Sequence, residues 1–288
     1  MRFNRVDGTA LHVVRDGAAG PVVLFTQGLG GAWFDWDAVV PALAGDFRLI
    51  RFDRPGLGWS QSEPPAGGRP APQTAAGEAV RLAHLLDGLG LGDERVVVVA
   101  HSYGGFHAEA FARLFPERTA GLVFVDASVE PELTPRDAGT ARAVTRCVVA
   151  ALRFAGLNRV FGPVVRQLIV AVASEHRFEP DRVSARAVYG SSRVVAATAN
   201  ELTAYRDVAV ELLELRCERP VPRVPVRLLV GMGYPGSGGA VRLERQHGFA
   251  ALFPHAELRE LHDAKHLIAS DRPDAVADAV REIAAAGG

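Results

Sequence analysis

Ser102 is the residue whose setting most clearly predicts chemistry. It follows the apolar run Val96–Ala100 and precedes Gly104, after which residues 106–115 have the pattern of a helix. A buried strand that turns sharply into a helix lifts this hydroxyl above the sheet and directs it at the helix N-terminus, where free N–H groups favour a developing negative charge. An unactivated hydroxyl is a poor nucleophile near neutral pH, so Ser102 needs a neighbouring base.

The remaining chain alternates strands and helices around this turn. Apolar and β-branched runs predict strands at 2–6, 10–15, 21–25, 47–52, 96–100, 122–125, 226–230 and 257–261. Helical patterns are found at 33–43, 74–91, 106–115, 240–252 and 273–285. This alternation predicts an α/β fold, with an eight-stranded, mostly parallel sheet and helices on both faces.

A long central segment interrupts the alternation. From about residue 130 to 219 no strand is predicted, and apolar residues recur at helical spacing in 144–152, 160–169 and 192–216. We therefore expect a helical cap, residues 129–219, inserted after the sixth strand. The core would consist of residues 1–128 and 220–288.

The order of these motifs resembles the α/β-hydrolase family with a lid. The resemblance rests on Gln27–Gly31 and Asp53–Ser60 after two strands, Ala100–Gly105 at the position of that family's nucleophile elbow, Val125–Ser128, and Lys265-His266 after the last strand. It covers nearly the whole chain and implies an enzyme without a cofactor. The chain is most similar to lidded hydrolases that act on small organic esters, lactones and carbon–carbon bonds. Epoxide hydrolases and haloalkane dehalogenases of this fold use an aspartate at the elbow, so Ser102 excludes them.

The family resemblance implies a catalytic histidine late in the chain. His266 fits, because it follows the last predicted strand and precedes the closing helix, and His262 is the second candidate. His101 is predicted to be structural, because neighbouring strand side chains point to opposite faces and the ring cannot easily reach the hydroxyl of Ser102.

The acid of the triad is less clearly placed. The family usually takes it from the loop after the seventh strand, but residues 231–239 contain no carboxylate. Some members take the acid from the end of the sixth strand, where Asp126 stands, although an Asp there can also simply cap a strand. Glu244 is the second candidate, and a Ser–His dyad without an acid stays open. The acid would fix the tautomer of the imidazole.

Two backbone N–H groups are expected to bind the oxyanion. Tyr103, the residue after the nucleophile, supplies one, and Leu29 in the loop after the first buried strand supplies the other. The family commonly has His-Gly where this chain has Gln27-Gly28. That histidine mainly holds the loop, and a glutamine amide can also form hydrogen bonds.

Other patterns exclude several functions. The net charge of −1 gives no reason to expect nucleic acid or an acidic membrane as a partner. No signal peptide, long apolar span or metal-ligand cluster is predicted, so we expect a cytoplasmic protein without metal.

Cys147 and Cys217 are expected to be buried thiols. The glycine-rich run 231–236 is not expected to bind a nucleotide, because a proline lies inside it, and residues 53–56 are expected to form a structural turn.

These features favour a serine hydrolase that cleaves an ester, lactone or thioester of a small hydrophobic substrate through an acyl-enzyme. A lyase, cyclase or carbon–carbon bond hydrolase on the same fold, using Ser102 and His266 only as acid and base, is the alternative. A non-catalytic small-molecule binder is a third hypothesis. Neither the substrate nor the oligomeric state is indicated by the sequence.

Overall fold

The computed structural model describes residues 2–63, 73–130, 156–176, 182–234 and 238–286, together with positions 144, 147 and 151. Within these residues one eight-stranded sheet has the order β1-β2-β4-β3-β5-β6-β7-β8. The strands are β1 (Arg2–Val6), β2 (Thr9–Asp16), β3 (Val22–Thr26), β4 (Arg48–Phe52), β5 (Val96–His101), β6 (Thr119–Val125), β7 (Val226–Gly231) and β8 (Ala256–Leu261).

The sheet is parallel except at one edge. Strands β3 to β8 pair in parallel, whereas β2 is antiparallel to both β1 and β4. Every residue of β3 and β5 is buried, which is why these strands read as continuous apolar runs rather than alternating ones. The predicted α/β fold with a mostly parallel, eight-stranded sheet is confirmed.

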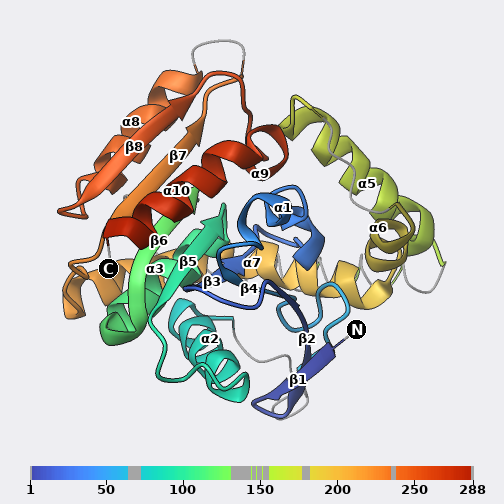
Figure 1. The fold of residues 1–288 in the computed structure, drawn as a ribbon. Helices are drawn as coiled ribbons and strands as arrows, with labels where there is room; N and C mark the ends of the chain where they lie inside the picture. Colours follow the sequence, from blue (N-terminus) through green and yellow to red (C-terminus); the bar gives the residue numbers. More distant parts are fainter. Residues whose placement is uncertain are drawn as a thin grey trace.

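Helices cover both faces of the sheet (Figure 1). One face packs against α2 (Ala75–Gly88), α3 (Gly104–Leu114), α7 (Ser192–Glu218) and α8 (Gly238–Ala250). The other packs against η1 (Trp33–Trp36), α1 (Val40–Leu43), α9 (Ile268–Asp271) and α10 (Pro273–Ala286). Side chains of β3 alternate between the two layers: Val22 and Leu24 point to the first, and Val23 and Phe25 to the second.

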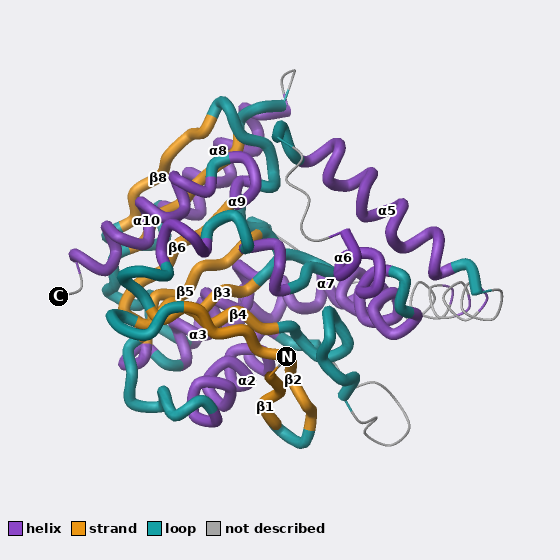
Figure 2. Tube along the Cα trace, turned by 45° about the vertical axis from the view of Figure 1, so that its right-hand side comes forward, coloured by secondary structure: helices purple, strands orange, loops and turns teal. Residues whose placement is uncertain are grey.

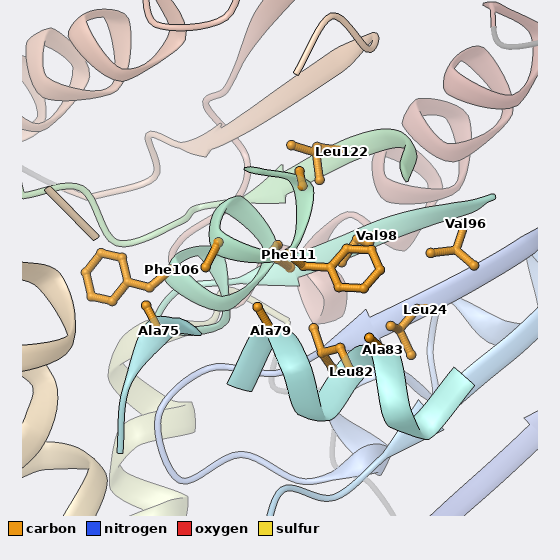
Figure 3. Close-up of a cluster of buried hydrophobic side chains, with 14 of the residues drawn as sticks. Leu24, Ala75, Ala79, Leu82, Ala83, Val96, Val98, Phe106, Phe111 and Leu122 are labelled. Carbon is orange, nitrogen blue, oxygen red and sulfur yellow. The ribbon is translucent and has the colours of Figure 1, made fainter. Parts of the chain in front are cut away.

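The larger apolar cluster fixes the helix that follows Ser102. Figure 3 shows Phe111 of α3 lying between Leu82 of α2 and Val98 of β5. All three side chains are at most 1% exposed. Burial of this face holds α3 against the sheet, and its N-terminus therefore lies at the carboxyl end of β5.

The expected cap region contains α5 (Asn158–Ala173), α6 (Arg182–Tyr189) and α7 among its described residues. The predicted helical segments 160–169 and 192–216 lie inside α5 and α7, whereas most of 144–152 is outside the described residues.

Helix α7 contributes Val208 and Leu212 to the same apolar cluster as the strands. Helix α5 lies at the side of the molecule (Figure 2) and exposes a run of apolar side chains: Val160, Phe161, Val164, Val165, Leu168, Ile169 and Val172. The division into core and cap stays a prediction.

The expectation of two buried thiols is wrong. Cys147 and Cys217 are both exposed. Cys217 belongs to the last turn of α7, beyond Leu215, the last buried residue of that helix. Cys217 is helical, as its pattern predicts, but it lies on the outward side of the helix.

Phe111→Ala tests the packing that holds α3. Removing a fully buried Phe leaves a cavity, so we expect a loss of about 3–5 kcal/mol in the free energy of unfolding, measured by urea denaturation. Leu202→Ala, at a side chain that is 64% exposed, is the matched control and should change stability little. Equal effects of the two variants would contradict this description of the core.

Candidate active site

Ser102 occupies a strained turn between β5 and α3. Its φ is +50°, in the left-handed region that residues with a Cβ rarely adopt. A Cβ on Gly104 would lie 2.8 Å from the Thr26 carbonyl oxygen, and one on Gly105 would lie 2.8 Å from the Cβ of Ala127. Glycine is therefore required at both positions. Ser102 itself is partly exposed at the carboxyl end of β5.

His266 and Asp126 meet at the same edge of the sheet. Asp126 directly follows β6, the neighbour of β5, and His266 lies in the loop that follows β8. His266 Nδ1 lies 2.6 Å from Asp126 Oδ2. An ionised carboxylate only accepts, so Nδ1 carries the proton, and Nε2 of the neutral ring is free to accept one.

Asp126 is a buried carboxylate with several partners. It adopts a left-handed φ of +45°, and its Oδ1 accepts from the Gly231 N–H at 3.3 Å and from Arg242 at 3.0 Å. Burial acts to raise the pKa of Asp126, but the hydrogen bond and charge of His266, together with Arg242, bring that pKa below its ordinary value. The group is therefore an anion wherever the imidazole works as a base.

Arg242 also ties this carboxylate to the loop that carries His266. Its guanidinium donates to the Gly231 carbonyl and lies 5.1 Å from the ring centre of Tyr234. The hydroxyl of Tyr234 in turn accepts from the His266 N–H at 3.1 Å. Arg242 and Tyr234 thus link the Asp126 carboxylate to the backbone of His266.

The structure does not bring the second candidates for the acid and the histidine, Glu244 and His262, into contact with a triad partner. Glu244 is exposed on α8, and the His262 side chain is 77% exposed, with its Nε2 3.7 Å from Glu260. Asp126 is therefore the carboxylate within hydrogen-bonding distance of His266, although it follows the sixth strand rather than the seventh.

His101 is a buried neutral ring. Its Nε2–H donates to the His266 carbonyl at 3.0 Å, and the two rings lie 4.6 Å apart. Burial, followed by the charge of His266, lowers the pKa of His101 to about 3. Its contact is with the backbone of the histidine loop, which fits the structural role predicted for it.

The two expected oxyanion donors come from adjacent turns. Among the described residues, neither the Leu29 N–H nor the Tyr103 N–H has a hydrogen-bond partner. Gln27, which stands in place of the family's usual histidine, donates from Nε2 to the Phe52 carbonyl at 2.6 Å. The glutamine therefore holds this loop to β4.

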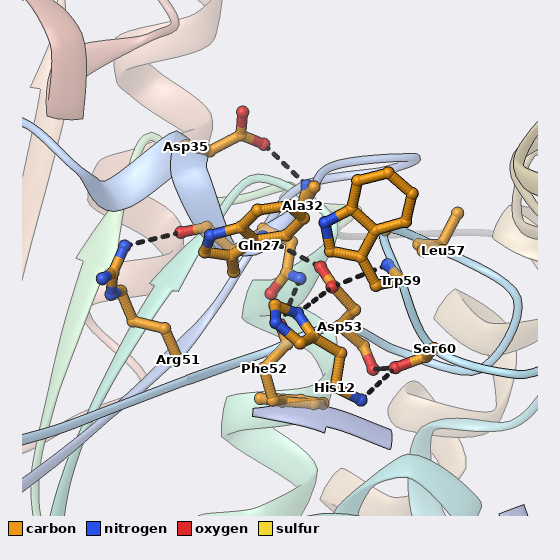
Figure 4. A network of polar contacts seen from close by, with 12 residues as sticks. His12, Gln27, Ala32, Asp35, Arg51, Phe52, Asp53, Leu57, Trp59 and Ser60 are labelled. Atoms are coloured by element: carbon orange, nitrogen blue, oxygen red, sulfur yellow. Dashed lines mark hydrogen bonds and ion pairs between the residues drawn. The ribbon is translucent and has the colours of Figure 1, made fainter. Parts of the chain in front are cut away.

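Asp53, directly after β4, forms a buried network of polar contacts (Figure 4). Its carboxylate accepts from the N–H groups of Trp33 and Trp59 and lies 2.8 Å from His12 Nδ1. Ser60 donates to the Asp53 carbonyl. Asp53, His12 and Ser60 are at most 2% exposed, so this second Ser–His–Asp grouping is closed to substrate and organises the loop structurally.

The described residues contain neither a metal-binding cluster nor a membrane-spanning helix. No group of three His, Cys, Asp or Glu side chains among them could hold a metal ion, and no described helix is long and apolar enough to cross a membrane. In the glycine-rich run 231–236, a Cβ on Gly231 would lie 2.1 Å from the Lys265 carbonyl oxygen. Close backbone packing explains this glycine; positions 235–236 lie outside the described residues.

The sequence did not indicate three charged residues of the site. Arg242 contacts Asp126 from α8, and Arg54 and Glu201 form a buried ion pair beside the loop that carries Leu29. The 147 positions between Arg54 and Glu201 explain why no local pattern shows the pair.

His101→Gln tests the linkage between this buried ring and folding. The unfolded chain binds a proton at His101 near pH 6.5, whereas the folded chain does not until about pH 3, so stability falls as pH drops through this range. The variant should reduce the slope of unfolding free energy against pH, between about pH 6 and 4, by up to about 1.4 kcal/mol per unit. His262→Gln, at an exposed ring, is the control in the same urea series. Equal slopes for wild type and His101→Gln would count against a buried neutral ring.

Comparisons with known proteins identify the family of this chain. The chain matches the profile of the Alpha/beta hydrolase family over residues 23–279. It is 33% identical over 125 residues to Epoxide hydrolase B of Mycobacterium tuberculosis. The aligned segment covers 40% of this chain and 32% of that protein. It is 39% identical over 129 residues to 2-hydroxy-6-oxo-2,4-heptadienoate hydrolase of Pseudomonas putida, covering 44% of each. The matched segments thus span less than half of either relative.

A solved structure resembles the chain over nearly its full length. That of a thermophilic esterase from Thermogutta terrifontis, with malate bound, has a TM-score of 0.69 at 26% identity and covers 98% of this chain and 96% of the esterase. The family profile spans most of the chain, and the eight-stranded, mostly parallel sheet is the fold of that family. The protein therefore belongs to the α/β-hydrolase family.

Proposed function

We propose that this protein is a serine hydrolase that cleaves an ester, lactone or thioester bond of a small hydrophobic substrate. The observation that carries the proposal is the 2.6 Å contact between His266 Nδ1 and Asp126 Oδ2, at the sheet edge where Ser102 begins its turn. In the neutral ring this contact places the proton on Nδ1, so Nε2 can accept one. A serine nucleophile needs such a base.

The acylation step follows from these roles. The Ser102 hydroxyl attacks the substrate carbonyl while His266 Nε2 takes its proton. The carbonyl oxygen becomes an oxyanion, to which the N–H groups of Leu29 and Tyr103 donate. The tetrahedral intermediate then collapses, and the leaving alcohol or thiol departs with the proton from His266.

Water completes the cycle. His266 removes a proton from a water molecule, which attacks the acyl-enzyme and releases the acid with Ser102 restored. Asp126 keeps its charge throughout and stabilises the imidazolium that forms twice per turnover. This route uses side chains, backbone and water alone, so it requires no cofactor.

An apolar substrate suits the surroundings of the carboxyl edge. Leu29 follows β3, Val129 follows β6, and Tyr205 comes from α7; all three are partly buried apolar residues packed against the main cluster. Apolar groups of a substrate at this edge would gain by leaving water. The serine at the turn separates the proposed reaction from the epoxide chemistry named for one relative, since the family resemblance associates that chemistry with an aspartate.

Trapping the acyl-enzyme tests the reaction class. We expect a fluorophosphonate probe to label wild-type Ser102, and intact-protein mass spectrometry of His266→Ala with a p-nitrophenyl ester to show an acyl adduct on Ser102. Ser102→Ala is the control and should show neither product. Turnover without any adduct would contradict this mechanism and favour acid–base chemistry by a lyase or cyclase.

Asp126→Asn tests the identity of the acid. An asparagine keeps the shape but no longer enforces the correct tautomer, so kcat for ester hydrolysis should fall by up to about 10⁴-fold. Glu244→Gln should leave kcat within about twofold, because Glu244 is an exposed side chain of α8. The opposite ranking of the two variants would assign the acid to Glu244.

A further inference from the structure

The loop that carries Leu29 is held by an arginine from another loop. Arg54 Nη1 donates to the Gln27 carbonyl at 2.6 Å, and its Nη2 donates to the Gly28 carbonyl at 2.8 Å. Arg54 is only 2% exposed. Its planar fork therefore fixes two successive carbonyl groups of this loop from the interior of the protein.

Glu201 of α7 completes the arrangement. Its Oε1 accepts from Arg54 Nε at 2.6 Å, and its Oε2 accepts from Arg54 Nη2 at 3.0 Å. The same Oε2 accepts from the Gly30 N–H at 2.7 Å. Glu201 is 1% exposed, so one carboxylate, remote in sequence, binds both the arginine and the loop itself.

These contacts determine where the Leu29 N–H points. The Gly28 carbonyl and the Leu29 N–H belong to one planar, trans peptide group, so they point in opposite directions. Because Arg54 holds the carbonyl, the N–H is directed away from Arg54. Glu201 holds the N–H of the next peptide group, at Gly30. The peptide groups on both sides of the Leu29 Cα are thereby fixed.

The fixed peptide group lies against the nucleophile. A Cβ built on Gly28 would lie 3.2 Å from the Ser102 Cβ and 2.8 Å from His101 Nδ1. The Leu29 N–H has no partner among the described residues, as noted above. Its direction is therefore set beside the serine, without a competing acceptor from this part of the chain.

We propose that Glu201 and Arg54 are positioning residues for the oxyanion donor at Leu29, an inference that rests on the proposed serine hydrolase. Stability alone is a poor explanation of the pair, because a buried ion pair costs desolvation that its attraction often only balances. Its specific consequence is geometric. Burial opposes the charge of Arg54, but the contacts with Glu201 more than compensate, so the pKa of Arg54 lies above its ordinary value.

The pair also gives α7 a role in the reaction. Helix α7 brings Glu201 to the oxyanion loop and Arg193 to the neighbouring loop, where it donates to the carbonyls of Gly56 and Gly58. Tyr205, one turn further along, stacks on Tyr103, the residue expected to supply the other donor. One face of α7 therefore contacts both turns that are expected to bind the oxyanion.

Glu201→Gln and Arg54→Lys test the proposal by steady-state kinetics with a p-nitrophenyl ester. Glutamine can still accept from the Gly30 N–H but loses the charge, and lysine keeps the charge but cannot hold two carbonyls as the fork does. We expect kcat per folded enzyme to fall about 10- to 100-fold, with KM within about threefold, because a misdirected donor affects the transition state. Glu214→Gln, at an exposed glutamate of the same helix, is the matched control and should behave as wild type.

An oxyanion-forming inhibitor separates positioning from general stability. A trifluoromethyl ketone adds to the serine and carries an oxyanion, so its Ki should rise in parallel with the loss of kcat/KM across the variants. A loss of thermal stability with kcat and Ki unchanged would overturn the proposal. If Glu201→Gln does not fold, Arg54→Lys carries the test.

Failure of the underlying function has a different signature. If wild-type Ser102 reacts with neither the fluorophosphonate nor the ketone, the serine hydrolase itself is contradicted, and the positioning proposal falls with it. If the wild type reacts and both variants match it in kcat and Ki, only the positioning proposal is overturned.

Discussion

The hydrogen bond between Asp126 and His266 is the interaction on which the rest of the proposed site depends. A carboxylate buried at the carboxyl end of a central strand loses its hydration. It stays ionised only if hydrogen-bond donors replace that water, and otherwise it takes up a proton. Here the imidazole, the Gly231 N–H and Arg242 supply them. Since the carboxylate stays charged, it selects the histidine tautomer that accepts a proton on Nε2. The left-handed backbone at Asp126 is the local strain associated with this geometry.

The carboxyl edge of the sheet is assembled by buried side chains as much as by the strands. Asp53 organises one loop through its hydrogen bonds to Trp33, Trp59 and His12, and the Arg54–Glu201 pair organises the next. Helix α7 takes part in this scaffold and shares its apolar cluster with the strands. Helix α5, by contrast, exposes most of its apolar side chains. Of the helices described in the segment expected to form a cap, α7 is therefore integrated with the core, whereas α5 lies at the periphery.

The fold and the tight turn at Ser102 could be predicted because their signals are local. Continuous β-branched runs identify buried strands, and the small residues around Ser102 identify a tight strand–helix turn. Asp126 could be named only as one of several candidates, since the sequence does not show which carboxylate reaches His266. Contacts such as Arg54–Glu201 and Arg242–Asp126 join residues more than 100 positions apart, so no periodicity reveals them. The predicted helix at 33–43 is two short helices, η1 and α1, and α6 was not predicted.

The most direct test of the central claim is the protonation state of the His266 ring at slightly alkaline pH. Two-bond ¹H–¹⁵N correlation spectra of ¹⁵N-labelled protein distinguish the two ring nitrogens, and His266→Gln assigns the signals. The account predicts a protonated Nδ1 with a strongly downfield proton, a bare Nε2, and loss of the downfield signal in Asp126→Asn. A ring protonated on Nε2 with a bare Nδ1 would contradict it, because that nitrogen could not take the serine's proton.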